Sequence, residues 1–184
     1  MKVPEDAYSI WPEPNRDYTA NVIRLGYSSL LTPKQVFDYD ILTETRDVLK
    51  ETEVPFYDRT LFDCKRIEAL SRDGSTKIPM SIVYRKDLED EEASNEDNLV
   101  LKQTAPLFLY GYGSYGACMD PSFDFKRLVL LKRGVVYVIA HIRGGGEMGM
   151  PWYEDEGKYL SKQNTFYDFA DCAKSLIANK ITTR

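Results

Sequence analysis

The stretches PLFLYGYGSYG (residues 106–116) and VVYVIAHIRGGGEMG (residues 135–149) decide the fold of this 184-residue chain. Each is an apolar run that ends in a glycine-rich turn, which predicts buried strands in the middle of a covered sheet. Segments 123–134 and 164–180 follow these runs and carry apolar residues at helical spacing. Strand, helix, strand and helix in this order predict an α/β fold with a parallel pair. Ligands of such sheets bind beyond the carboxyl ends of the strands, so the glycine-rich turns are the candidate site.

The two predicted helices rest on different signals. Segment 123–134 ends at Gly134 and places four side chains at helical spacing: Phe125, Leu128, Val129 and Lys132. In segment 164–180, Thr165 and Asp168 have the spacing of a capping box at a helix start. Apolar side chains then share one face, which is interpreted as core packing: Phe166, Phe169, Ala173, Leu176 and Ile177.

The first half of the chain reads as strands and turns. Residues 1–18 show no period and are predicted to form a lead-in loop. Short alternating segments follow, as in a sandwich or a propeller blade: residues 23–29, 35–41 and 47–54. After a linker at residues 54–58, Asp73-Gly74 separates the alternating segments 61–70 and 77–86. This pattern predicts a β-hairpin, with Met80, Ile82 and Tyr84 on one face of its return strand.

Composition and charge argue against several classes of function. The net charge of −5 gives no reason to expect binding to nucleic acid or to an anionic membrane. No apolar run reaches the length of a membrane span. One histidine and three dispersed cysteines (Cys64, Cys118 and Cys172) argue against a zinc site, and no metal or cofactor is expected. Reduced thiols indicate a cytoplasmic protein, and the acidic segment 87–98 is interpreted as a solvated surface loop.

The first glycine-rich turn permits a nucleotide-binding interpretation. Gly111, Gly113 and Gly116 satisfy the G-x-G-x-x-G pattern directly after a strand, which predicts a dinucleotide site when a helix follows. Asp120-Pro121 interrupts the chain where that helix should already be running. The next strand ends in His141-Ile142-Arg143 and offers no acid for a ribose. The dinucleotide module therefore stays a remote alternative.

A second interpretation makes the tyrosines of the same turn the working groups. A phenol at the carboxyl end of a parallel strand can donate a hydrogen bond to a developing oxyanion. Acyl-transfer chemistry also needs a nucleophile and a base, yet the chain contains no G-x-S-x-G string. Ser114 is interpreted as a turn serine, and His141 as structural, because the base follows the nucleophile in α/β-hydrolases. No catalytic triad can be assembled from these residues.

Several stretches together resemble the prolyl oligopeptidase family of serine peptidases. They are LYGYGSYG, MDPSF, LLKRGVVYVIAHIRGGGEMG, WYEDEGK and KQNTFYDF, joined by IRLGYSSLLTPKQVFDYDI and SRDGSTKIPMSIVYRK. The sequence is most similar to the oligopeptidase B branch, whose members cleave peptides after Arg or Lys. The resemblance implies a serine peptidase that acts on short peptides with basic residues. A prolyl-specific oligopeptidase is the nearest alternative.

The resemblance also implies how the chain is divided. Residues 1–55 are expected to be the last strands of a β-propeller. Residues 56–184 are then the N-terminal half of an α/β-hydrolase domain, cut before the nucleophile. On this expectation the isolated chain is inactive as a peptidase. Its alternative is an inactive product that acts only as a binding or structural fragment, and an open sheet edge would favour self-association.

Three site residues follow from the resemblance. Tyr112 matches the family's oxyanion-stabilising tyrosine, and Tyr115 matches an aromatic that lines the pocket for the residue before the cleaved bond. Asp120 matches an acid that binds a basic residue one position further back. The second acid of that pair is Ser122 here, which weakens the case for a paired-basic preference. Arg143 and Glu147 flank three glycines and are interpreted as a loop-fixing ion pair without a catalytic role.

Overall fold

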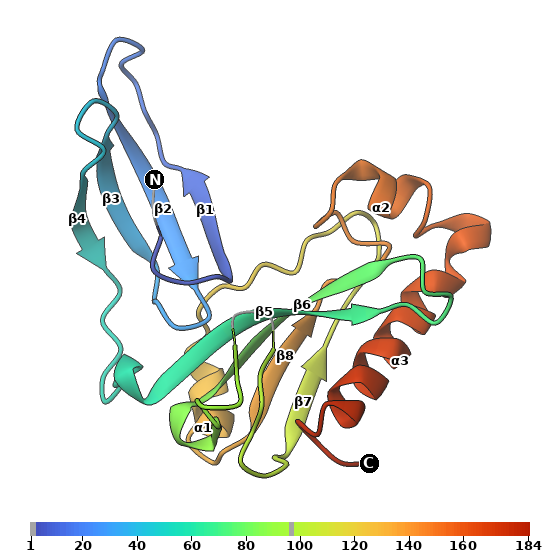
Figure 1. Cartoon of the computed structure of the whole chain (residues 1–184). Coiled ribbons are helices and arrows are strands. Elements are labelled where there is room, and N and C mark those ends of the chain that lie inside the picture. The colour runs from blue at the N-terminus through green and yellow to red at the C-terminus, as the bar shows by residue number, and fades with distance from the viewer. Residues whose placement is uncertain (1–2, 96–97) are drawn as a thin grey trace.

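The computed structural model describes residues 3–95 and 98–184, which form two four-stranded sheets (Figure 1). The first sheet is an antiparallel meander in chain order: β1 (Tyr8–Pro12), β2 (Val22–Ser29), β3 (Gln35–Asp40) and β4 (Arg46–Glu51). The three alternating segments are thus confirmed as strands. The predicted lead-in loop over residues 1–18 is wrong, because β1 pairs with β2 within it. This five-residue strand was missed since it is short and ends in a proline, a residue that is depleted in strands.

The second sheet carries the α/β part of the chain, and its strand order is β5-β6-β8-β7. β5 (Phe62–Leu70) and β6 (Lys77–Arg85) form the predicted hairpin, with Gly74 at a φ of 72° in the turn. β7 (Leu107–Tyr110) and β8 (Val136–Ala140) pair in parallel, as predicted, and β8 pairs antiparallel with β6. The α/β class is therefore confirmed. The assignment of the first sheet to a propeller, and a boundary at residue 55, stay predictions.

The position of β7 differs from the expectation. All five residues of β8 are buried, but β7 lies at the edge of the sheet and alternates between partly buried and exposed side chains. Phe108 and Tyr110 are 47% and 41% exposed, while Leu107 and Leu109 pack against the core. The prediction of a central, covered strand is wrong for Pro106–Tyr110, because an apolar run does not reveal which neighbours pair with it.

The connection between β7 and β8 is a shorter helix than its pattern predicts. A 3₁₀ helix (Phe125–Arg127) leads into α1 (Leu128–Leu131), and Gly134 ends the turn at a φ of 78°. Leu128 and Leu131 are buried, whereas Phe125 and Val129 are 63% and 54% exposed. Lys132 is exposed as well, so only Leu128 of the four positions at helical spacing in segment 123–134 is buried. The side chain of Asp124 accepts a hydrogen bond from the Lys126 backbone N, which stabilises the 3₁₀ turn.

The long predicted helix is confirmed as α3 (Gln163–Ala178). Its expected core face is right at Leu176, which is buried, and at Phe169, which packs against the core, but it is wrong at Phe166. Phe166 is 67% exposed, and the core side carries Thr165, Asp168, Asp171, Cys172 and Leu176. The capping box is also wrong, because Thr165 and Asp168 bond to Arg143 instead of the helix start. The remaining helical segments are α2 (Met150–Glu154) and short 3₁₀ helices at Arg59–Leu61, Lys86–Leu88 and Tyr159–Ser161.

The second sheet separates two clusters of buried side chains. Met80, Ile82 and Tyr84 lie together in the larger cluster, as predicted, and α3 adds Cys172 and Leu176 to it. Leu128 and Leu131 of α1 belong to the other cluster, with side chains from the opposite face of the sheet: Phe62, Cys64, Val83, Tyr137 and Ile139. The sheet is thus covered by α3 on one face and by α1 on the other. The three cysteines are free thiols, and Cys64 and Cys172 are buried.

The acidic segment 87–98 is only partly a solvated loop. Glu89 is 7% exposed and accepts hydrogen bonds of 2.7 Å from the Lys65 ammonium and from the Tyr84 hydroxyl. The interpretation of the whole segment as solvated is therefore wrong at Glu89, which anchors its start to the sheet. Residues 96 and 97 of the segment lie outside the described residues.

A pair of substitutions tests the corrected face of α3. Leu176→Ala should lower the free energy of unfolding by about 2–5 kcal/mol, because it leaves a cavity at a site that is 1% exposed. Phe166→Ala should change it by less than about 0.5 kcal/mol, since that ring is largely in solvent. Urea denaturation of both variants measures the difference. Equal losses would contradict the assignment of the buried face.

Candidate active site

The two glycine-rich turns contact each other backbone to backbone at the carboxyl ends of β7 and β8. The Gly116 N donates to the Gly144 O at 3.0 Å. A Cβ on Gly144 would lie 2.1 Å from the Gly113 O, and one on Gly146 would lie 2.5 Å from the Gly116 O. Real Cβ atoms do not approach backbone that closely, so side chains at these positions would force the turns apart. The glycines serve this close approach.

Tyr112 lies on the first of these turns, directly beyond β7. Its side chain is 46% exposed and lines a pocket of about 230 Å³. The other lining residues come from both turns and from α3: Gly111, Ile142, Thr165, Phe166 and Phe169. Phe166, which sequence reasoning placed in the core, is thus a wall of this pocket. A phenol at this place can donate a hydrogen bond to negative charge that develops in a bound substrate.

Tyr115 and Asp120 lie near the same turn but do not line the Tyr112 pocket. Tyr115 has a left-handed backbone with a φ of 59°, and its side chain is 81% exposed. Asp120 is exposed at the rim of a separate pocket of about 220 Å³, which His141 and Glu147 also line. The structure therefore distributes the three predicted site residues over one continuous loop instead of gathering them around one cavity.

His141 takes part in a buried arrangement that has the order of a serine, histidine and acid triad. Its Nε2 lies 2.7 Å from the Ser81 Oγ, and its Nδ1 lies 3.5 Å from the Glu147 Oε1. Ser81 is 0% exposed and His141 is 2% exposed, so no substrate carbonyl can reach this hydroxyl. The arrangement joins β6 to the glycine turn, in agreement with the structural interpretation of His141.

Glu147 is held by neighbours other than Arg143. Burial by itself raises the pKa of its carboxyl, but the interaction with His141 and a 2.9 Å hydrogen bond from the Met119 N outweigh burial and lower the pKa. The carboxylate therefore stays ionised and fastens the segment that leads to Asp120. The predicted ion pair between Arg143 and Glu147 is wrong.

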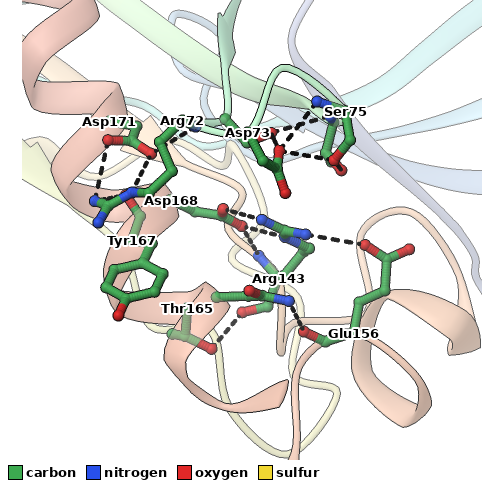
Figure 2. A network of polar contacts seen from close by, with 12 residues as sticks. Arg72, Asp73, Ser75, Arg143, Glu156, Thr165, Tyr167, Asp168 and Asp171 are labelled. Carbon is green, nitrogen blue, oxygen red and sulfur yellow. Dashed lines mark hydrogen bonds and ion pairs between the residues drawn. The ribbon is translucent and has the colours of Figure 1, made fainter.

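Arg143 instead forms a two-pronged ion pair with Asp168 of α3 (Figure 2). Its Nε and Nη2 donate to the two carboxylate oxygens at 2.8 and 2.7 Å, and its backbone N donates to the same side chain at 3.0 Å. Glu156 accepts a further bond of 3.2 Å. Arg143 is 5% exposed, and its hydrogen bonds to Asp168 raise its pKa. The periodicity of α3 hid this partner, because a polar residue on the core face was interpreted as a cap.

A second polar contact ties the β5–β6 turn to α3, beside the first (Figure 2). Arg72 donates to the Asp171 carboxylate at 3.0 and 3.1 Å, and its guanidinium stacks 3.8 Å from the centre of the Tyr167 ring. Asp73 accepts a hydrogen bond from the Ser75 N and thereby closes the same turn. No local sequence signal marks these contacts, since they join residues about a hundred positions apart.

The geometry does not supply what a dinucleotide site needs. Residues 111–124 are all described and contain no helix, so the first glycine turn does not lead directly into a helix as a dinucleotide-binding turn does. Among the described residues, no group of three or more His, Cys, Asp or Glu side chains is placed to hold a metal ion. Within residues 3–95 and 98–184, no helix combines the length and the apolar character that crossing a membrane requires.

Comparison with known proteins identifies the family. Residues 121–184 match the prolyl oligopeptidase family. Dipeptidyl aminopeptidase BI of Pseudoxanthomonas mexicana is 42% identical over 177 residues, and Protease 2 of Moraxella lacunata is 41% identical over 180 residues. The chain belongs to the prolyl oligopeptidase family. The predicted membership is thereby confirmed.

The similarity of this family member to its relatives extends to the fold. Oligopeptidase B from Trypanosoma brucei, solved with covalently bound antipain, superposes with a TM-score of 0.82 at 40% identity. That match covers 99% of this chain and 24% of the solved chain. The sequence matches cover 96% and 97% of this chain but only 23% and 24% of the two relatives. The chain thus spans about a quarter of the length of the proteins that it resembles.

The buried ion pair of the family member can be tested by stability. Asp168→Asn should lower the free energy of unfolding by about 3–5 kcal/mol, because it leaves the buried Arg143 without its main counter-charge. Asp171→Asn should cost about 1 kcal/mol or less, since its partner Arg72 is 42% exposed. Urea denaturation of both variants gives the comparison. A loss below about 1 kcal/mol for Asp168→Asn would contradict the importance of the pair.

Proposed function

We propose that this chain is part of a serine peptidase of the oligopeptidase B kind, which hydrolyses short peptides after Arg or Lys. The position of Tyr112 carries the proposal: its phenol lines a pocket at the carboxyl end of a parallel strand, half exposed and beside a second glycine turn. The likeness to oligopeptidase B and to Protease 2 supports the substrate class. In this proposal Tyr112 donates its hydroxyl hydrogen to the substrate's carbonyl oxygen as that oxygen gains negative charge.

In the proposed peptidase, the nucleophile, the general base and its acid are supplied by parts of the longer protein other than these 184 residues. His141 is the only histidine of the chain, and its Nε2 is engaged with a fully buried serine. Within the proposal the chain supplies the oxyanion donor and the binding surface around it. Because an oxyanion donor without a nucleophile gives little acceleration, the chain alone is proposed to be inactive.

The substrate contacts follow from the exposed residues of the same loop. Tyr115 presents its ring to solvent and is proposed to line the pocket of the residue before the cleaved bond. Asp120 is proposed to attract a basic side chain one position further back, with support from its exposed carboxylate beside Glu147. A Pro-specific relative is also similar, the prolyl endopeptidase of Elizabethkingia meningoseptica, at 30% identity. Comparing turnover of arginyl, lysyl and prolyl amides separates the two specificities.

Self-association of the isolated chain and a cytoplasmic location are also proposed. β7 is an edge strand with exposed aromatic side chains, which supports self-association of the isolated chain through that edge. Three free thiols support a cytoplasmic location.

Substitution of Tyr112 tests the oxyanion assignment. In a longer family member that carries the same YGYGSYG segment, Tyr112→Phe should lower kcat by roughly 10²–10³-fold, because it removes one donor to the oxyanion. Tyr18→Phe is the matched control, since Tyr18 lies fully exposed on the connection between β1 and β2 and should leave kcat unchanged. Steady-state kinetics with an arginyl amide measures both. Unchanged kcat in Tyr112→Phe would remove this residue from the mechanism.

Substitution of Asp120 tests the basic subsite. Asp120→Asn should raise KM about two- to fivefold for peptides with Lys or Arg one position before the residue at the cleaved bond, the range of an exposed ion pair. Peptides with Ala there should show no change, because they offer no charge to lose. Ser122→Asp should have the opposite effect and lower KM for the peptides with Lys or Arg at that position, because it adds a second acid. An equal change for both peptides would show that Asp120 acts on the loop and not on the substrate charge.

A further inference from the structure

Lys162 makes contacts that the proposed chemistry does not yet use. Its ammonium donates to the Gly113 O and, at 2.7 Å, to the Ser114 Oγ, which both lie directly after Tyr112. A third hydrogen bond of 3.1 Å reaches the Thr165 Oγ1 on α3. An ammonium carries three N–H donors, so all of its hydrogens have partners here. The cation thus binds the turn that carries the phenol.

The turn needs such a contact because its backbone is costly to hold. Gly113, Tyr115 and Gly116 have φ values of 62°, 59° and 66°. A left-handed conformation at a residue with a Cβ costs about 1–2 kcal/mol, and glycine leaves the turn with many alternative conformations. Tyr112 lies between Gly111 and Gly113. The direction of its phenol therefore depends on what fixes the Gly113 and Ser114 backbone.

Thr165 connects Lys162 to the second glycine turn through its hydroxyl. Its hydroxyl has a single hydrogen, and the 2.6 Å contact with the Arg143 O is the shorter of its two contacts with carbonyl oxygens. It therefore donates to Arg143 and accepts from Lys162. Arg143 is in turn fixed by Asp168, one helical turn further along α3 (Figure 2). Lys162 and Thr165 thus join the Tyr112 turn to the buried ion pair.

Stability of α3 does not explain a lysine at this place. Lys162 is the residue before the first turn of α3, where the helix dipole disfavours a positive charge. Partial burial also lowers the pKa of its ammonium, which means that the surroundings disfavour the charge. A cation that is placed against both effects is accounted for by its hydrogen bonds to the loop.

We propose that Lys162 is a positioning residue, which fixes the Gly113–Ser114 backbone so that the Tyr112 phenol points at the developing oxyanion. This inference rests on the proposed role of Tyr112 and deepens it. Lys162 does not touch the reacting atoms, so its loss should change the orientation of Tyr112 and should leave substrate binding nearly intact.

A double-mutant cycle in the longer family member tests the inference. Lys162→Met should lower kcat about 10- to 100-fold with little change in KM, the effect of a misplaced catalytic group. In the Tyr112→Phe background the same change should cost nothing further, because no hydroxyl is left to orient. Lys162→Arg, which keeps the charge and the donors, should restore part of kcat. Lys174→Met, on an exposed part of the same helix, is the control.

The outcomes separate this inference from the proposed function. Equal losses from Lys162→Met in both backgrounds, or no loss in either, overturn the positioning role while Tyr112 keeps its own. Unchanged kcat in Tyr112→Phe overturns the proposed function first. In the 184-residue chain, amide hydrogen exchange at residues 113–116 should speed up in Lys162→Met and not in Lys174→Met, with β8 unchanged. Unaltered exchange at residues 113–116 would also overturn the inference.

Discussion

The ion pair between Arg143 and Asp168 is the interaction on which the candidate site depends. It lies inside the protein, where two charges that lose water need each other and every remaining donor needs an acceptor. Asp168 meets this need three times, through both prongs of the guanidinium and through the Arg143 backbone N. The pair therefore fixes the start of the second glycine turn against α3. The first glycine turn, which packs on the second, is therefore positioned by the same ion pair.

Close steric packing against the second glycine turn fixes the first glycine turn as much as hydrogen bonds do. Its carbonyl oxygens point at glycine Cα atoms of the second turn, at distances that leave no room for a Cβ. A mobile loop would not need glycines for that reason. The glycines are thus explained by the close backbone packing of the two turns. The sequence resembles a phosphate-binding loop because both structures require backbone without side chains at these positions.

Sequence reasoning found what is local and missed what is not. The alternation of residues 61–86 around Asp73-Gly74 sufficed for the hairpin, and the long amphipathic pattern sufficed for α3. The edge position of β7 depends on pairing between distant strands, which an apolar run does not encode. Phe166 was placed in the core since periodicity counts apolar side chains, whereas the buried Arg143 required Asp168 on that face.

The same limit applies to the site. The glycine spacing and the resemblance pointed to Tyr112, and the structure places this residue at a pocket. The residues that contact the turn directly after Tyr112 are Lys162, just before α3, and Thr165, in the first turn of α3; both lie about fifty residues later in the chain. Their sequence pattern indicates only a helix start. Which backbone oxygens they bind follows from the packing of α3 on the sheet, and no local rule contains that information.

The border strands of the two sheets differ in charge and in proline content. β4 (RDVLKE) and β5 (FDCKRIEAL) carry several charges, and β1 ends in proline. Among the described strands at sheet borders, only β7 (LFLY) has neither feature. Charges and proline hinder the addition of another strand. If two copies pair along β7, the border strands that remain exposed in each copy carry charges or proline. Addition of further copies would then stop at a dimer and would not continue into a fibre.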